Sequence, residues 1–190
     1  SILGGPNAVP AAQYGSTISC HVRKDAWSNH GSVSTIWGQL NAYQRSAEIL
    51  SFGGSAGAVG LHIYSAASAH SDVMSRSTAT GVIVLGEWNH IVSVWRGTLS
   101  RTSIEVWVNG VRLDSVDGGS STIPSAPPAE CEMHLFETLY QHNPSGYLAA
   151  DRDYTVDGTV ADLRRWHRPL SVSESLYHLT LGRYIAQPGQ

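Results

Sequence analysis

Charge, and lysine above all, is scarce in this sequence of 190 residues. Charged residues make up 14 % of the chain, against about 25 % in a typical soluble domain, and Lys24 is the only lysine. The formal net charge of −3 disfavours a nucleic-acid-binding protein that acts by neutralising phosphates. Gly, Ser, Thr and Ala replace the missing charge, and this composition favours strands and turns over a helical bundle or coiled coil.

Long apolar runs and cysteines are also few. No stretch approaches the roughly 18 consecutive apolar residues of a transmembrane helix, so we expect no insertion into a membrane. The first residues, 1–6, lack the basic and apolar regions of a signal peptide. Cys20 and Cys131 are the only cysteines, and the sequence is compatible with a disulfide between them or with two buried thiols.

What the sequence does contain is a series of short strand patterns separated by Gly, Asn, Asp, Ser and Pro. In the strand predicted from Thr17 to Arg23, alternation places Ile18, Cys20 and Val22 on one face. The other predicted strands are 32–37, 48–52, 59–64, 82–85, 88–95, 103–108, 111–116, 132–136 and 158–166.

Two local motifs mark the ends of elements. The dipeptide Asn109-Gly110 follows the strand at 103–108 and predicts a tight type I′ turn, after which the chain pairs back. Ser171 and Glu174 form a capping-box pattern, in which each side chain satisfies a free backbone N–H, and this predicts a helix over 172–179.

Strands at roughly ten-residue spacing with one short late helix predict an all-β protein, a two-sheet antiparallel jelly-roll sandwich. The stretch 118–130, rich in Gly, Ser and Pro, predicts a surface loop. We expect one domain over residues 16–180, with an N-terminal arm at 1–15 and a C-terminal tail at 181–190.

Three segments resemble a known superfamily. The run Gly86-Glu-Trp-Asn-His-Ile-Val-Ser-Val-Trp95, followed by Ile104-Glu-Val-Trp-Val-Asn-Gly110, is similar to the central segment of concanavalin A-like domains of the laminin G and pentraxin type. Residues 158–174 resemble the closing strand and helix of those domains, and 16–24 the opening strand. The resemblance implies a jelly roll that most often binds glycans or proteins, sometimes with Ca²⁺ at a loop rim.

Aromatic side chains are the candidate ligand-binding residues, because sugar C–H faces stack on aromatic rings. Trp107 lies on the strand face opposite Ile104, Val106 and Val108, and is therefore a candidate exposed platform. Trp88 and Trp166 are assigned to the core. The remaining candidates, which fall in predicted loops, are Trp27, Tyr140, Tyr147 and Tyr154.

Two acidic loops are candidate calcium sites, since Ca²⁺ prefers oxygen ligands. Asp151, Asp153 and Asp157 supply three carboxylates before the last strand, although the spacing misses the EF-hand pattern. Asp114 and Asp117 form a second, smaller group. The alternative for both loops is ordinary turns in which Asp side chains bond the local backbone.

Catalytic patterns are incomplete. Residues 53–57 match G-x-S-x-G, but the nucleophile elbow needs a helix after the motif, and another strand is predicted there. Glu132 and Glu137 have the spacing of the two outer carboxylates in jelly-roll glycosidases, but His134 stands where those enzymes have an Asp. The nine histidines are dispersed, and His90 is interpreted as a satisfied core residue. We expect no enzymatic activity.

The sequence therefore leaves hypotheses of different classes. The first is a non-catalytic, lectin-like recognition domain that binds a surface glycan, on a polysaccharide or glycoprotein, for adhesion or attachment. The second is a structural subunit of an assembly, such as a phage virion decoration, spike or fibre protein, whose partners are further copies or virion neighbours. A glycoside hydrolase is the third. The first two predict a location outside the cell, at a cell surface or on a virion.

Overall fold

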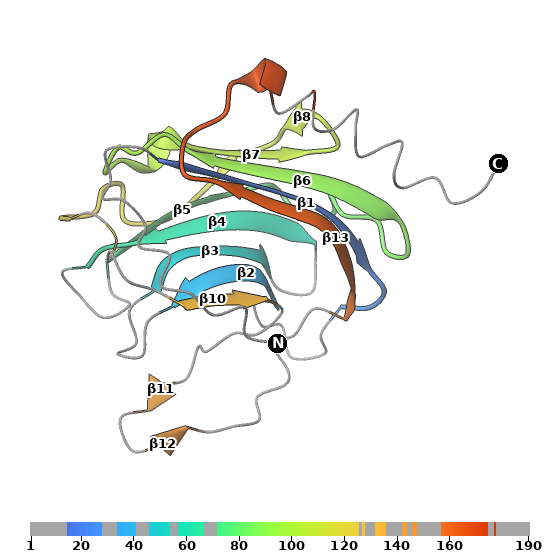
Figure 1. Ribbon diagram of the computed structural model, residues 1–190, viewed down its shortest axis with the longest axis horizontal. Helices are drawn as coiled ribbons and strands as arrows, with labels where there is room; N and C mark the ends of the chain where they lie inside the picture. The colour runs from blue at the N-terminus through green and yellow to red at the C-terminus, as the bar shows by residue number, and fades with distance from the viewer. Residues whose placement is uncertain are drawn as a thin grey trace.

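The computed structural model is a sandwich of two antiparallel β-sheets, one above the other in Figure 1. It describes residues 15–27, 34–40, 46–53, 57–66, 72–125, 127, 132–135, 142–143, 146–147, 157–174 and 177. Regular structure in these ranges is nearly all strand, so the predicted all-β jelly-roll class is confirmed. Within the same ranges, no helix has the length and apolar character needed to cross a membrane.

One layer is a five-stranded sheet. In spatial order its strands are β13 (Gly158–Trp166), β1 (Ser16–Lys24), β6 (Trp88–Trp95), β7 (Ile104–Val108) and β8 (Val111–Arg112). The first and last of the described strands, β1 and β13, are neighbours, and β1 also pairs with β6 along almost its whole length. A single 3₁₀ turn, η2 (Arg101–Ser103), leads into β7.

The other layer is a six-stranded sheet. In spatial order its strands are β10 (Glu132–Leu135), β2 (Ser34–Leu40), β3 (Ser46–Gly53), β4 (Ala58–Tyr64), β5 (Val73–Ser77) and β9 (Val116–Gly119). A separate two-stranded pair joins β11 (His142–Asn143) to β12 (Gly146–Tyr147).

The core lies between the two sheets and consists of their inward-facing side chains. The predicted alternation of β1 is confirmed, because Ile18, Cys20 and Val22 are fully buried. Trp37 and Leu61 face them from the six-stranded sheet. Burying a large apolar side chain contributes roughly 1.5–3 kcal/mol, so this layer is the main source of stability. Cys20 is a free thiol, and burial raises its pKa to about 12.

The predicted strand at 82–85 is wrong. These residues form turns and bends before β6. Ile83 is buried in the core and the half-buried Val82 packs against it, while Val84 and Leu85 are exposed. The flanking Gly81 and Gly86 have φ of 79° and 76°, a left-handed conformation that an extended strand does not contain. The apolar run is thus a tight connection anchored in the core by Ile83 and Val82.

The assignment of Trp88 to the core is also wrong. Trp88 is 37 % exposed, because the core-facing residues of β6 are Ile91 and Trp95, and alternation places Trp88 on the outer face at the start of the strand. It pairs there with Arg23, whose guanidinium lies 5.8 Å from the ring centroid. Trp166 is half-buried, and Trp95, on the same strand as Trp88, is the tryptophan of β6 that enters the core.

Both local motifs are confirmed. Asn109 and Gly110 have φ of 52° and 82°, as a type I′ turn requires at its two central positions. At the predicted helix start, the Ser171 hydroxyl accepts from the backbone N–H of Glu174, and the Glu174 carboxylate accepts from the backbone N–H of Ser171. Residues 172–174 and 177 are helical. Residues 175–176 and 178–179 of the predicted helix fall outside the described ranges.

Candidate functional site

Trp107 lies on the outer face of the five-stranded sheet, as the alternation of its strand predicts. Along β7, Ile104, Val106 and Val108 are buried in the core between the sheets. Glu105 and Trp107 point to the opposite face, where the Trp107 side chain keeps part of its surface accessible to solvent. The strand therefore presents an aromatic ring on a rigid, hydrogen-bonded frame.

Glu105 fixes this ring and gathers two arginines around it. The Trp107 indole N–H donates to one carboxylate oxygen, Oε2, over 3.3 Å. The other oxygen, Oε1, accepts from Arg96 Nε at 2.7 Å and has Arg112 Nη1 at 3.5 Å. A half-buried indole N–H needs a partner, and a carboxylate supplies one that also attracts cations.

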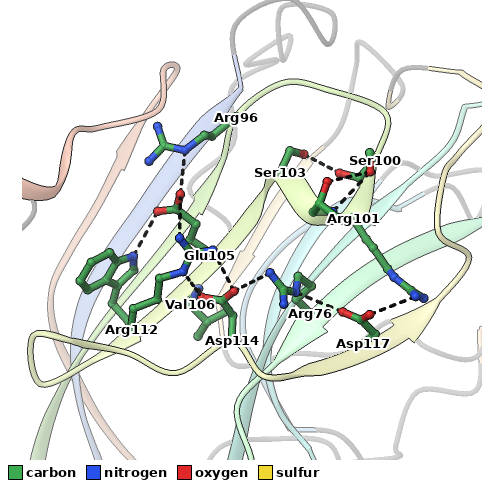
Figure 2. A network of polar contacts seen from close by, with 12 residues as sticks. Arg76, Arg96, Ser100, Arg101, Ser103, Glu105, Val106, Arg112, Asp114 and Asp117 are labelled. Atoms are coloured by element: carbon green, nitrogen blue, oxygen red, sulfur yellow. Dashed lines mark hydrogen bonds and ion pairs between the residues drawn. The ribbon is translucent and has the colours of Figure 1, made fainter.

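The Glu105 cluster is one end of a longer ladder of alternating charge, which Figure 2 shows. Its members come from both sheets and from the turns between them, and successive charged groups lie 2.6–3.5 Å apart. In order, the ladder consists of Arg96, Glu105, Arg112, Asp114, Arg76, Asp117 and Arg101. Four arginines and three carboxylates leave one net positive charge.

Asp114 is the buried centre of this ladder. Its Oδ1 and Oδ2 accept from Arg112 Nε and Nη2 at 2.6 and 3.1 Å, a two-point pairing, and Arg76 Nη1 lies 2.6 Å from Oδ2. The backbone N–H of Val106 also donates to Oδ1, over 3.3 Å. Because Arg76 belongs to β5 and Arg112 to β8, the carboxylate ties one sheet to the other.

The carboxylates of the smaller predicted calcium loop are therefore paired with arginines. Both oxygens of Asp117 lie beside guanidinium groups, Arg76 Nε at 3.1 Å and Arg101 Nη2 at 3.0 Å. Asp114 is engaged in the same way. Guanidinium donors satisfy these carboxylates, so the loop needs no metal ion to explain its acidic residues. Among the described residues, no three His, Cys, Asp or Glu side chains are grouped as metal ligands.

The larger calcium loop is only partly described. Asp157 is exposed at the start of β13, where its backbone carbonyl accepts from the N–H of Asp25 over 2.8 Å. Asp151 and Asp153 lie outside the described ranges. Calcium at this loop stays a prediction.

Trp27 is placed differently from Trp107. Its ring is half-buried and packs against the core, in an edge-to-face contact with Phe52 at 6.1 Å between centroids. Lys24 Nζ lies 5.3 Å from the Trp27 centroid. Tyr147 is in β12, and Tyr140 and Tyr154 lie outside the described residues. A role for these four aromatics in ligand binding stays a prediction.

The structure also brings together histidines that are far apart in the sequence. His21 and His90 are cross-strand partners on the outer face of the five-stranded sheet, and their rings stack with centroids 4.5 Å apart. His90 Nε2 lies 2.8 Å from the hydroxyl of Ser19. Both residues are buried, and His90 is satisfied as predicted, but it lies on the outer face of this sheet and not in the core between the sheets. Burial lowers the pKa of His21, more than Asp162 raises it.

The catalytic patterns are placed as follows. Gly53 ends β3 and pairs with Ala58, which begins β4, so the G-x-S-x-G segment connects two antiparallel strands. A nucleophile elbow connects a strand to a helix, and this context is not met. Glu132 begins β10, and Glu137 lies outside the described ranges.

The fold can now be compared with known proteins. No family model and no curated protein matches the sequence. Among solved structures, a heptameric SAP-like pentraxin from Limulus polyphemus matches with a TM-score of 0.61 and 17 % identity, over 89 % of this chain and 70 % of its own. The CBM40 domain of Ruminococcus gnavus IT-sialidase, bound to α2,3-sialyllactose, matches at 0.57 and 12 %, over 88 % of this chain and 83 % of its own.

Larger proteins contain the same fold as one part. The binding domain of botulinum neurotoxin serotype G matches with a TM-score of 0.61 and 11 % identity, but this chain spans 37 % of it. The chain likewise spans 24 % of a Trypanosoma rangeli sialidase. These neighbours have concanavalin A-like jelly rolls, and the resemblance seen in the sequence is confirmed at the level of the fold. Identities this low establish the fold alone.

Proposed function

We propose that this chain is a non-catalytic carbohydrate-binding domain, and that Trp107 is its stacking platform. The observation that carries the proposal is the position of Trp107 on the outer face of β7, half-exposed, with its N–H held by Glu105. An indole whose polar edge is satisfied internally offers its apolar face to a ligand. Sugar rings use such faces, while their hydroxyls find charged and polar groups at the rim.

The fold neighbours support this proposal. One of them is a carbohydrate-binding module solved with sialyllactose, and another is a sialidase solved with sialic acid. In the present chain the carboxylate that holds the aromatic ring, Glu105, also holds the guanidinium groups of Arg96 and Arg112. An arrangement of one ring and several fixed donors suits recognition of a polar, ring-shaped ligand.

A glycan array followed by calorimetry on the best ligand tests the proposal. Trp107→Ala should weaken binding by about tenfold or more, the loss typical of a central aromatic contact. Trp88→Ala is the matched control, because Trp88 is also an exposed tryptophan but lies at the end of the sheet. Equal effects of the two substitutions, or no glycan bound at all, would contradict the proposal.

Absence of catalysis is part of the proposal. Incubation with a polysaccharide panel should release no reducing ends. The informative variant is the double substitution Glu132→Gln and Glu137→Gln, because these carboxylates are the candidate acid and nucleophile. Turnover that disappears in this variant would replace the binding domain with a glycoside hydrolase.

The calcium hypothesis belongs to the same proposal. We infer that any Ca²⁺ requirement would come from Asp151, Asp153 and Asp157, since Asp114 and Asp117 are held by arginines. The array is therefore run with Ca²⁺ and with a chelator, and loss of signal in the chelator would support a metal-dependent site.

A subunit of a larger assembly is the second candidate, and one observation favours it. Val84, Leu85 and Trp88 are exposed apolar side chains on and beside a single connection, at the end of the sandwich. Such a group suits contact with a neighbouring subunit. Light scattering after size exclusion separates the candidates: a monomer weakens the assembly hypothesis, and a symmetric oligomer supports it. Both candidates place the protein outside the cell or on a virion.

A further inference from the structure

The guanidinium of Arg96 is hydrogen-bonded through its Nε, while its two terminal nitrogens are available to a ligand. Its Nε donates to Glu105 at 2.7 Å, and its backbone N–H donates to the carbonyl of Ser103 at 3.0 Å. Within the described part of the chain, the two terminal nitrogens have no partner. Figure 2 shows them turned away from Glu105. The planar fork of an arginine is shaped to bind a carboxylate, sulfate or phosphate through two parallel hydrogen bonds.

The surrounding charges are arranged by depth. The side chains of Glu105 and Asp114 are 9 % and 3 % exposed, whereas those of Arg96 and Arg112 are 41 % and 44 % exposed. The carboxylates therefore lie beneath these two arginines and are paired with their guanidinium groups. What this part of the surface presents to solvent is cationic, although the whole chain carries a net charge of −3.

The aromatic ring and the open fork belong to one site. Trp107 Nε1 and Arg96 Nε donate to the two oxygens of the same Glu105 carboxylate, so the ring and the guanidinium lie side by side. We infer that this surface binds an anionic saccharide, whose ring stacks on Trp107 and whose carboxylate or sulfate takes the fork of Arg96. The inference rests on the proposed function and names its ligand class.

The experiment uses matched pairs of glycans that differ by one anionic group: 3′-sialyllactose and lactose, and a sulfated and an unsulfated form of one disaccharide. The intact protein should bind the anionic member at least about tenfold more tightly, with affinity falling as salt is added. Arg96→Gln should remove this preference and leave the weaker, neutral binding. Arg96→Lys should recover only part of it, because an ammonium cannot form the two-point contact.

Arg23 provides the control substitution. Its side chain is also 41 % exposed, and its Nε is likewise paired with a carboxylate, Asp25 Oδ1 at 3.0 Å. Arg23→Gln should leave the preference for the anionic glycan unchanged. Melting curves of all variants check that they are folded.

The outcomes separate the inference from the proposed function. If neutral and anionic glycans bind equally and Trp107→Ala weakens both, the carbohydrate-binding function holds and the inference is wrong. A preference that survives Arg96→Gln, or that Arg23→Gln removes equally, also overturns the inference. If no glycan of either kind binds, the proposed function itself fails.

Discussion

Lys24, the only lysine of the chain, has an unusual environment for a charged residue. Its side chain is 1 % exposed, and its Nζ has no hydrogen-bond partner in the described structure. The ammonium lies 5.3 Å from the ring centroid of Trp27 and 5.2 Å from that of Phe52. Cation–π attraction, about 2 kcal/mol for a desolvated pair, offsets part of the cost of burial. Burial nevertheless lowers the pKa of Lys24, against the opposing effect of Asp157.

Replacing this ammonium should stabilise the fold. We expect Lys24→Met to raise the free energy of unfolding by about 1–2 kcal/mol at neutral pH, because a buried donor without a partner is removed and most of the volume is kept. Lys24→Ala, which leaves a cavity, is the control and should not stabilise. Urea denaturation of the three proteins measures the difference.

The same substitution has a predicted pH dependence. Because the pKa of Lys24 is lowered from 10.5 by folding, the unfolded chain binds more protons between the two values. The stability of the original protein therefore rises with pH through that window. The advantage of Lys24→Met should shrink between neutral pH and about pH 10. A constant advantage would mean that the amine is not desolvated in the native state.

Single residues also show what sequence reasoning could and could not reach. Alternation along one strand was enough to place Trp107 on the outer face. It could not identify Arg96 as the neighbour of that ring, because the link passes through the Glu105 carboxylate and depends on side-chain geometry. The exposure of Trp88 was missed because both faces of β6 carry apolar residues, so the sequence did not show that the face of Ile91 and Trp95 is the one that enters the core.

At the scale of elements, the turn between β7 and β8 is set by its own two residues. Asn109 and Gly110 both adopt left-handed φ, which most residues with a Cβ avoid. The Asn109 side chain adds a second function, because its Oδ1 accepts from the backbone N–H of His90 at 2.9 Å. The turn thereby fixes β8, which carries Arg112 into the charged ladder.

Two substitutions separate these contributions. Asn109→Ala should lower the free energy of unfolding by about 2 kcal/mol, since it combines an unfavourable backbone conformation with the loss of the acceptor for His90. Asn109→Gly keeps the backbone freedom and loses only the acceptor, so about half of that loss is expected. Chemical denaturation gives both values. Equal losses would show that the backbone conformation contributes nothing.

The elements that could be predicted are those with a strong local pattern. The strands that became β1, β4, β6, β7 and β13 alternate or contain β-branched and aromatic runs. By contrast, β5 was not predicted, since Val73-Met-Ser-Arg-Ser has little local preference and is held by pairing with β4 and β9. The charged ladder was missed with it, because Arg76 enters through this strand.

For the whole molecule, ion pairs join the two sheets near opposite edges of the five-stranded sheet. At one edge Arg76 of β5 holds Asp114, which follows β8. At the other, Arg165 of β13 contacts Glu48 of β3, with Nη2 and Oε2 3.2 Å apart. The Arg165 guanidinium also lies 5.2 Å from the ring centroid of Trp37. Arg164, its neighbour in sequence, pairs instead with Asp162 at 2.7 Å.

Replacing only one member of the Arg165–Glu48 pair should lower the free energy of unfolding strongly. Among the described residues, Arg165→Met leaves the buried Glu48 carboxylate with the Ser16 hydroxyl as its remaining donor, and we expect the free energy of unfolding to fall by about 3–5 kcal/mol. The double variant Arg165→Met with Glu48→Leu should lose much less, because no buried charge remains. Arg164→Met is the control at the neighbouring position, where a half-exposed pair should contribute less than about 1 kcal/mol.

Acid should rescue the single variant. Burial already raises the pKa of Glu48, and Arg165 and Ser16 counteract this effect. Without Arg165 the pKa rises further, so the native state of Arg165→Met holds a proton that the unfolded chain releases near its ordinary pKa. Stability of the variant then falls as pH rises through this window and is regained on acidification.

Unfolding free energies of Arg165→Met and of the double variant, compared at about pH 5 and at neutral pH, measure the effect. The deficit of the single variant relative to the double should be smaller at the lower pH, and a deficit that is constant or larger there would show that Glu48 is not the uncompensated charge between the two sheets.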